Sequence, residues 1–264
     1  MDSTNWQRQT PDKPLFPDLL WSRPENRTQA GKLLIVGGNA QGFAAAGEAY
    51  QAAVKAGIGT ARVLLPDSLQ KTVGKVFEAG EYAPSTPSGS FGRQALAELL
   101  DMSQWSDGVL LAGDLGRNSE TAVLLDEFSA KYENQLTVTQ DAADYFTKTA
   151  TMLDRQNTLL VISFAQLQKL AANARFARAF KFDMDFLHLV EALHEFTEQH
   201  EAPIIVKHLD NVLVAVNGQV STTKLKSKPA EIEVAAHAAV WWLQNPIRTF
   251  EALTTAVLSE GDQN

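Results

Sequence analysis

The sequence predicts an α/β fold in which one mainly parallel sheet lies between two layers of helices. Short apolar runs alternate with longer segments of helical period along most of the chain, as in repeated strand–helix–strand units. The first unit is the clearest. The apolar run Lys32–Val36 ends at Gly37-Gly38, and the Ala-rich segment Ala44–Lys55 follows it and ends before Gly57. This order of strand, glycine turn and helix sets the pattern for the remaining elements.

The later elements continue the alternation. We expect strands at residues 60–65, 75–78, 108–112, 136–139, 158–162, 203–207 and 212–216. We expect helices at residues 118–132, 141–149, 164–173, 185–199, 230–243 and 249–258. The strand at 212–216 follows its predecessor too closely for a helical crossover, so the two should pair antiparallel near a sheet edge. The Pro- and Ser-rich segment 83–92 is either a surface crossover or a mobile flap over a site.

The length of the chain bounds its organisation. A chain of 264 residues suits one hydrophobic core of the α/β kind, so we expect a single domain over residues 1–264. Residues 1–31 are polar and Pro-rich and form an N-terminal strap. The apolar residues that we expect to dock this strap onto the body are Phe16, Leu19, Leu20 and Trp21.

Charge and composition narrow the function. The 31 acidic residues outnumber the 23 basic ones, and the net charge of −8 argues against nucleic-acid binding and against attraction to anionic membranes. The absence of cysteine excludes disulfides, thiolate metal sites and thiol nucleophiles. No apolar run approaches the roughly 18 residues of a membrane span, and the N-terminus lacks the apolar stretch of a secretory signal. We therefore expect a cytoplasmic protein without a nucleic-acid or membrane partner.

The loop Gly37–Gly42 (GGNAQG) lies between a strand and a helix, where backbone N–H groups can hold a phosphate. Asn39 occupies the second glycine position of G-x-G-x-x-G, and no P-loop pattern is present. A phosphate loop and a purely structural turn both remain open. A Rossmann dehydrogenase would also need an acidic residue at the end of the second strand, and Asp67 lies late for that role.

The surroundings of this loop make the pattern more specific. Together with the Ala-rich helix and Lys55–Gly59 (KAGIG), it resembles the ADP- or ATP-dependent NAD(P)H-hydrate dehydratases, which belong to the ribokinase-like superfamily. The family's leading glycines fall on Gly37 and Gly38, and its Gly-Ala pair falls on Ala44-Ala45. The resemblance covers roughly residues 22 to 260 and implies a ribokinase-like three-layer α/β/α fold.

Further motifs carry the resemblance toward the C-terminus. The family's G-P-G-L-G turn falls on Ala112–Gly116, where Asp114 replaces a glycine. Its L-D-A-D-A segment falls on Val138–Ala142, which keeps one acid as Asp141 and has Thr139 for the other. Its substrate-facing His and following Glu fall on Ser163 and Gln166. The resemblance implies a ligand-binding set, which comprises Gly37, Gly38, Asn39, Ala45, Gly116, Asp141 and Lys207.

The family's catalytic loop, G-[ST]-G-D at a helix N-terminus, falls on Ala230–Glu233 (AEIE). In the family the glycines let bare N–H groups converge on phosphate, and the Asp is the acid/base. Here Ile232 adds a branched side chain and Glu231 adds a charge where phosphate would lie. The resemblance makes Glu233 the catalytic candidate. At a helix start after Pro229, both glutamates also serve as stabilising first-turn acids.

Two classes of function remain open. The first, favoured by the changes at 230–233, is a catalytically degenerate protein that binds a small nucleotide-like ligand or a partner at the ancestral site. The second is an active NAD(P)H-hydrate dehydratase, a lyase that uses ADP or ATP as cofactor and Glu233 for proton transfer. The related enzymes are homo-oligomers, and Trp241, Trp242 and the Phe-rich stretch 176–186 suit an apolar interface. The six-residue spacing of three histidines puts them on different helix faces, which argues against a shared metal site; they are His188, His194 and His200.

Overall fold

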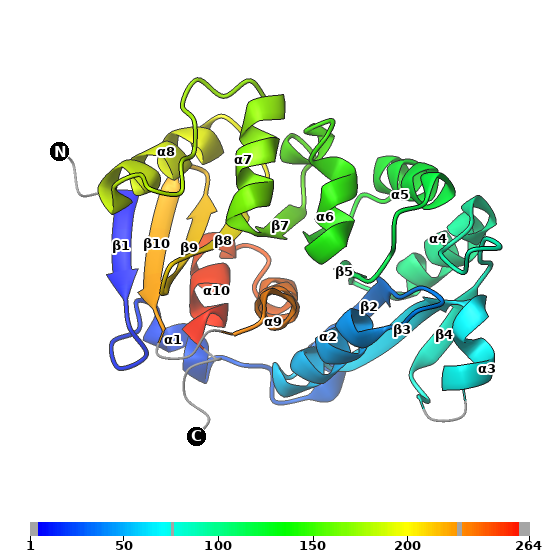
Figure 1. Cartoon of the computed structure of the whole chain (residues 1–264). Helices are drawn as coiled ribbons and strands as arrows, with labels where there is room; N and C mark the ends of the chain where they lie inside the picture. Colours follow the sequence, from blue (N-terminus) through cyan, green and yellow to red (C-terminus); the bar gives the residue numbers. More distant parts are fainter. Residues whose placement is uncertain (1–4, 75–76, 226–228, 259–264) are drawn as a thin grey trace.

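The computed structural model describes residues 5–74, 77–225 and 229–258. Over these residues the chain forms one mainly parallel sheet with helices on both faces, which confirms the predicted α/β class (Figure 1). The strand order across the sheet is β1-β10-β9-β8-β7-β6-β5-β2-β3-β4. No helix in this part of the chain combines the length and the apolar character that crossing a membrane requires.

The bounds of the elements follow the predicted alternation with several additions. The strands are β1 (Trp6–Gln9), β2 (Lys32–Gly37), β3 (Thr60–Pro66), β4 (Gly80–Ala83), β5 (Gly108–Gly113), β6 (Gln135–Thr139), β7 (Thr158–Ile162), β8 (Ile204–His208), β9 (Asn211–Val216) and β10 (Gln219–Lys224). The helices are α1 (Pro17–Trp21), α2 (Ala44–Lys55), α3 (Gln70–Val73), α4 (Leu96–Trp105), α5 (Ser119–Lys131), α6 (Gln140–Phe146), α7 (Phe164–Asn173), α8 (Phe186–Glu198), α9 (Glu231–Gln244) and α10 (Thr249–Ala256).

The central strands are buried on both faces, which is why they appear in the sequence as continuous apolar runs. Alternate residues of β2 enter different cores. Leu34 and Val36 pack with the layer of α4 to α8, and Leu33 and Ile35 pack with the layer of α2, α9 and α10. The sheet therefore separates two hydrophobic cores, and α2 and α9 lie together in the second layer.

The antiparallel pairing expected at the edge is confirmed, because Ile205 of β8 lies opposite Val214 of β9. The chain then turns at Asn217 and Gly218, both with positive φ, into the unexpected strand β10. This Asn-Gly pair is a strong hairpin signal. Residues 75–76 of the strand expected at 75–78 lie outside the described residues, and residues 77–78 are not in a strand, so that part of the prediction is wrong. The strand that pairs parallel with β3 is Gly80–Ala83.

The strap is held mainly by a strand that sequence reasoning missed. β1 pairs parallel with β10 at the edge of the sheet, and Gln9 lies opposite Thr223. Of the predicted docking residues, Leu19 is buried and the Phe16 ring lies 6.0 Å from that of Phe250. Trp21 is 88% exposed, and Leu20 is also exposed, so the expectation that these two dock is wrong.

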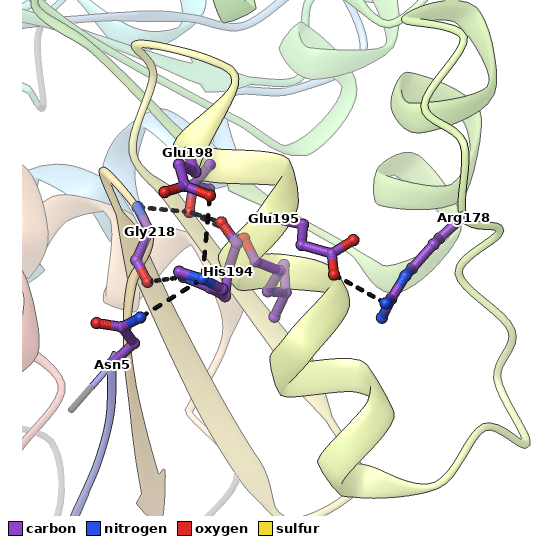
Figure 2. A network of polar contacts seen from close by, with 8 residues as sticks. Asn5, Arg178, His194, Glu195, Glu198 and Gly218 are labelled. Atoms are coloured by element: carbon purple, nitrogen blue, oxygen red, sulfur yellow. Dashed lines mark hydrogen bonds and ion pairs between the residues drawn. The ribbon is translucent and has the colours of Figure 1, made fainter. Parts of the chain in front are cut away.

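The polar contacts of α8 join the strap to the last hairpin (Figure 2). His194 contacts the Gly218 carbonyl through Nδ1, and its Nε2 lies 3.5 Å from the Asn5 amide nitrogen. His200 points elsewhere, and its Nδ1 lies 2.9 Å from the Asp154 carboxylate. The two histidines thus serve different contacts.

The two tryptophans that suited an oligomer interface lie inside the chain. Trp241 is 1% exposed, and the Trp242 indole N–H donates to the Thr249 hydroxyl at 3.1 Å. Both belong to the core beneath α2, α9 and α10, so they cannot supply an exposed apolar surface. Phe182 remains 64% exposed in the Phe-rich stretch. The homo-oligomer stays a prediction, without the tryptophans as its basis.

The buried amide of Gln9 leads to a prediction about stability. Its Nε2 donates to the Thr223 hydroxyl at 2.9 Å and to the Thr254 carbonyl at 2.7 Å, which ties β1 to β10 and α10. Replacing Gln9 with Leu leaves buried partners unsatisfied, so we expect the free energy of unfolding to fall by about 1 to 3 kcal/mol in urea denaturation. The same change at exposed Gln104 is the control. Equal effects at the two positions would contradict this account of β1.

Candidate functional site

The predicted site residues gather at the carboxyl edge of the sheet. Because β2, β5, β6 and β8 all run in the same direction, their carboxyl ends lie at one edge of the sheet. The helices that follow β2, β5 and β6 begin at this edge. The set defined here as the edge site comprises Gly37, Gly38, Asn39, Ala45, Gly116, Asp141, Lys207 and Glu233.

The glycine pair joins two strands closely. The Gly38 amide donates to the Gly113 carbonyl at 3.0 Å, and a Cβ on Gly37 would lie 2.6 Å from that same oxygen. Gly38 also has φ of +95°, which favours glycine. Asn39 closes the turn by exchanging backbone hydrogen bonds with Gly42 at 2.9 and 3.0 Å. The glycines are thus explained by close backbone approach, in line with the structural alternative.

The segment 83–92 lies against this turn. The Ala40 amide and the Ser68 hydroxyl both donate to the Gly89 carbonyl at 2.9 Å. On the other side, the Asn118 amide nitrogen donates to the Ser88 hydroxyl at 3.0 Å. These contacts attach the tip of the segment to three separate elements, as expected of a fixed crossover rather than a mobile flap.

Asp114 fills the N-terminus of α2. The Asp114 backbone has a φ of +56°. Its side-chain Oδ2 accepts a hydrogen bond from the Ala45 amide, the second residue of α2, at 2.8 Å. The Asn39 side chain donates to the Asp114 carbonyl at 2.6 Å and holds the turn in place. The start of α2, where backbone amides could have met a phosphate, therefore carries the chain's own carboxylate. The replacement of a family glycine by an acid was the sequence signal for this residue.

Glu231 places its carboxylate at the N-terminus of a second helix, α6. It extends from the start of α9, and its Oε1 lies 3.3 Å from the Gln140 amide, the first residue of α6, and 3.4 Å from the Thr139 hydroxyl. Burial raises the pKa of Glu231, although both hydrogen bonds and the nearby Lys207 oppose the shift. The ammonium group of Lys207 donates to the Pro229 carbonyl just before α9. Glu231 is therefore a contact between helices as well as a first-turn acid.

Asp141 supports the turn after β5. Its Oδ2 accepts from the Gly116 amide at 3.1 Å and its Oδ1 from the Leu115 amide at 3.4 Å, while the Tyr145 hydroxyl donates to the Gly116 carbonyl. Burial raises the pKa of the Asp141 carboxyl, and the neighbouring charge of Asp114 raises it further. The predicted ligand-binding residues Asp141 and Gly116 are thus bonded to each other.

The catalytic candidate Glu233 turns back on its own helix. Its Oε2 accepts from the Ala230 amide at 3.0 Å, which is one half of a capping box; the alanine has no side-chain oxygen for the other half. Ile232 is only 2% exposed and packs in the second core. Glu233 also lines a cavity of about 510 Å³ between α2 and α9. The stretch 230–233 is therefore a packed helix start and lacks the glycines of the family loop.

The residues at two further family positions also cap a helix. Ser163 accepts from the Gln166 amide at 3.3 Å, and the Gln166 side chain accepts from the Ser163 amide at 3.0 Å, which completes a capping box for α7. Gln166 also donates to the Gln140 carbonyl at 2.8 Å. These side chains satisfy neighbouring helix ends at the edge site.

Comparison with known proteins identifies the fold. No family model and no curated protein matches the chain. A ribokinase-like superfamily protein from Enterococcus faecalis is 14% identical with a TM-score of 0.74, covering 97% of this chain and 87% of its own. An ADP/ATP-dependent NAD(P)H-hydrate dehydratase from Bacillus subtilis, co-crystallised with ATP and Mg²⁺, is 11% identical with a TM-score of 0.65, covering 92% and 86%. A pyridoxal kinase from Staphylococcus aureus is 14% identical with a TM-score of 0.54, covering 86% and 84%. The predicted ribokinase-like fold is confirmed.

The raised pKa of Glu231 leads to a prediction about pH. The ordinary pKa of a glutamate carboxyl is 4.5, and the folded protein raises it. At pH values above 4.5, the unfolded chain therefore releases the Glu231 proton more readily than the folded protein does. The associated stabilisation is complete below that value and is lost as pH rises through the folded-state pKa. Glu231→Gln keeps an acceptor for the Gln140 amide but does not titrate. We therefore expect the variant to gain stability relative to the unmodified protein between pH 4 and pH 7, measured by urea unfolding. A relative gain that shrinks as pH rises would contradict the raised pKa.

Proposed function

We propose that this chain is a divergent NAD(P)H-hydrate dehydratase-like protein that has lost nucleotide-dependent catalysis and retains a binding role. The observation that carries the proposal is the position of two carboxylates. Asp114 accepts the amide of Ala45, and Glu231 accepts the amide of Gln140. Two helix N-termini of the edge site are therefore occupied by negative charge from the chain itself.

Electrostatics makes this arrangement unfavourable for phosphoryl chemistry. A phosphate at either helix start would displace a carboxylate or face it, and two unit charges 4 Å apart repel by about 4 kcal/mol at an effective dielectric constant of 20. Transfer to a substrate hydroxyl also needs preorganised N–H donors, and loss of one such donor typically costs about 100- to 1000-fold in rate. Buried Ile232 further removes the open backbone that the family's second glycine provides.

The same charge pattern narrows the proposed ligand. Lys207 is bonded to the Pro229 carbonyl and lies near Glu231, so its charge is already partly balanced. A ligand suited to the edge site places an uncharged or cationic group there, such as a nicotinamide ring. Any phosphate group of that ligand lies outside the edge site. The ligand-binding roles of Gly37, Gly38 and Asn39 belong to this proposal. A protein partner with a basic surface satisfies the same charge condition.

The alternative is an active dehydratase with Glu233 as the acid/base. One observation favours it, because Glu233 retains a carboxylate that lines a cavity between α2 and α9. Against it, the same carboxylate caps the Ala230 amide, and glutamate is one methylene longer than the family's aspartate. A displacement of about 1 Å costs on the order of 100-fold in rate.

Enzyme assay separates the two functions. We expect the purified protein, incubated with hydrated NADH and ADP or ATP, to form no NADH above the uncatalysed background, followed by absorbance. An active dehydratase of the family under the same conditions is the positive control. Turnover within about tenfold of that control would contradict the loss of catalysis, since it corresponds to a difference in activation free energy of only about 1.4 kcal/mol. Glu233→Gln would then be the first variant to test.

A further inference from the structure

The cavity between α2 and α9 is formed by one face of each helix. The lining residues of α2 follow a spacing of three and four, which places them on one side of the helix. They are Ala44, Gly47, Glu48, Gln51, Ala52 and Lys55. Glu233 and His237 are four residues apart and face them from α9. Since the residues at 44, 47 and 52 are small, the two helices leave a cavity of about 510 Å³ that is open to solvent, within the usual range of ligand pockets. The lining side chains Glu48, Gln51 and Lys55 are exposed at its rim.

An aromatic ring forms part of the wall. Phe43 precedes α2 and lines the cavity, and its ring is held by that of Phe77 at 5.7 Å between centroids. A Cβ placed on Gly47 would come within 3.6 Å of the Phe43 ring, so the glycine marks the floor beside it. This part of the cavity suits an apolar or aromatic group.

The charged side chains around the cavity determine whether a positively or a negatively charged ligand is favoured. Glu48 and Glu233 contribute two negative charges and Lys55 one positive charge. His237 adds none at neutral pH, because burial, with Lys55 and Arg23 nearby, lowers its pKa to about 4. The ionisable wall therefore sums to −1. Lys55 lies at the far end of α2, twelve residues or about 18 Å along the helix from Phe43, so the aromatic end is acidic.

We propose that this cavity binds a small molecule that joins an aromatic or apolar ring to an amine. The ring lies against Phe43 and the helix face at Gly47, and the ammonium group lies toward Glu48 and Glu233. A carboxylate at the same place would face both glutamates. The cavity lies on the helical layer and shares Glu233 with the edge site. The proposal concerns binding alone, so it does not depend on catalysis at the edge site.

The test uses two probes that share one ring and differ in the charged group at the end of the chain. Tryptamine and indole-3-propionate share a ring and a chain of similar length. By isothermal titration calorimetry at neutral pH, we expect saturable binding of tryptamine and at least about tenfold weaker binding of indole-3-propionate, a difference of about 1.4 kcal/mol. Equal or tighter binding of the carboxylate, or no saturable binding of tryptamine up to millimolar concentration, would overturn the proposal.

Three variants test whether tryptamine binds in this cavity. Gly47→Phe fills the space and replaces a helical glycine, so it should fold, and we expect it to abolish tryptamine binding. Val54→Phe, at a position on α2 that is 45% exposed and outside the cavity, is the matched control and should bind normally. Glu233→Gln keeps an acceptor for the Ala230 amide but removes the charge, and we expect about fivefold weaker binding. Unchanged affinity in Gly47→Phe would place the amine elsewhere and refute the assignment.

Discussion

The arrangement of the site depends on how the helix N-termini at the carboxyl edge are satisfied. Every helix starts with backbone amides that have no partner within the helix. A parallel sheet brings several such ends together, which concentrates partial positive charge at one edge. Here Asp114 neutralises the start of α2 and Glu231 that of α6, at 2.8 and 3.3 Å from the respective amides. The positive edge that an anionic ligand would use is thus balanced internally.

This internal balance orders the neighbouring groups. Asp141 has its oxygens on the turn that carries Asp114, and the charges of the two acids act on one another. Lys207 donates to the Pro229 carbonyl just before α9, and its charge offsets that of Glu231. Most groups that could contact a ligand are therefore already in contact with each other. The fold is ribokinase-like, and two helix N-termini at its carboxyl edge are met by carboxylates of the chain itself.

The sequence predicts the parts of the fold whose pattern is local. The apolar runs of β2 and β5 are buried on both faces, so their composition identifies them without knowledge of the tertiary structure. β1 (WQRQ) and β10 (QVSTTK) are polar, and they become strands because Gln9 and the threonines bond across 214 residues of chain. The same limit applies to the site. The common edge follows from the topology, but the bonds that decide its chemistry join residues 69 and 91 positions apart.

Titration calorimetry with ADP tests directly whether the internal carboxylates exclude an anion. The variant Asp114→Gly, Glu231→Ser vacates both helix starts, and glycine suits the positive φ at position 114. A control, Asp101→Ser with Glu133→Ser, removes two exposed carboxylates and so changes the net charge equally. We predict no measurable binding by the unmodified protein or the control, and at least about tenfold tighter binding by the vacated variant. Binding of ADP by the unmodified protein as tight as by the vacated variant would contradict the account.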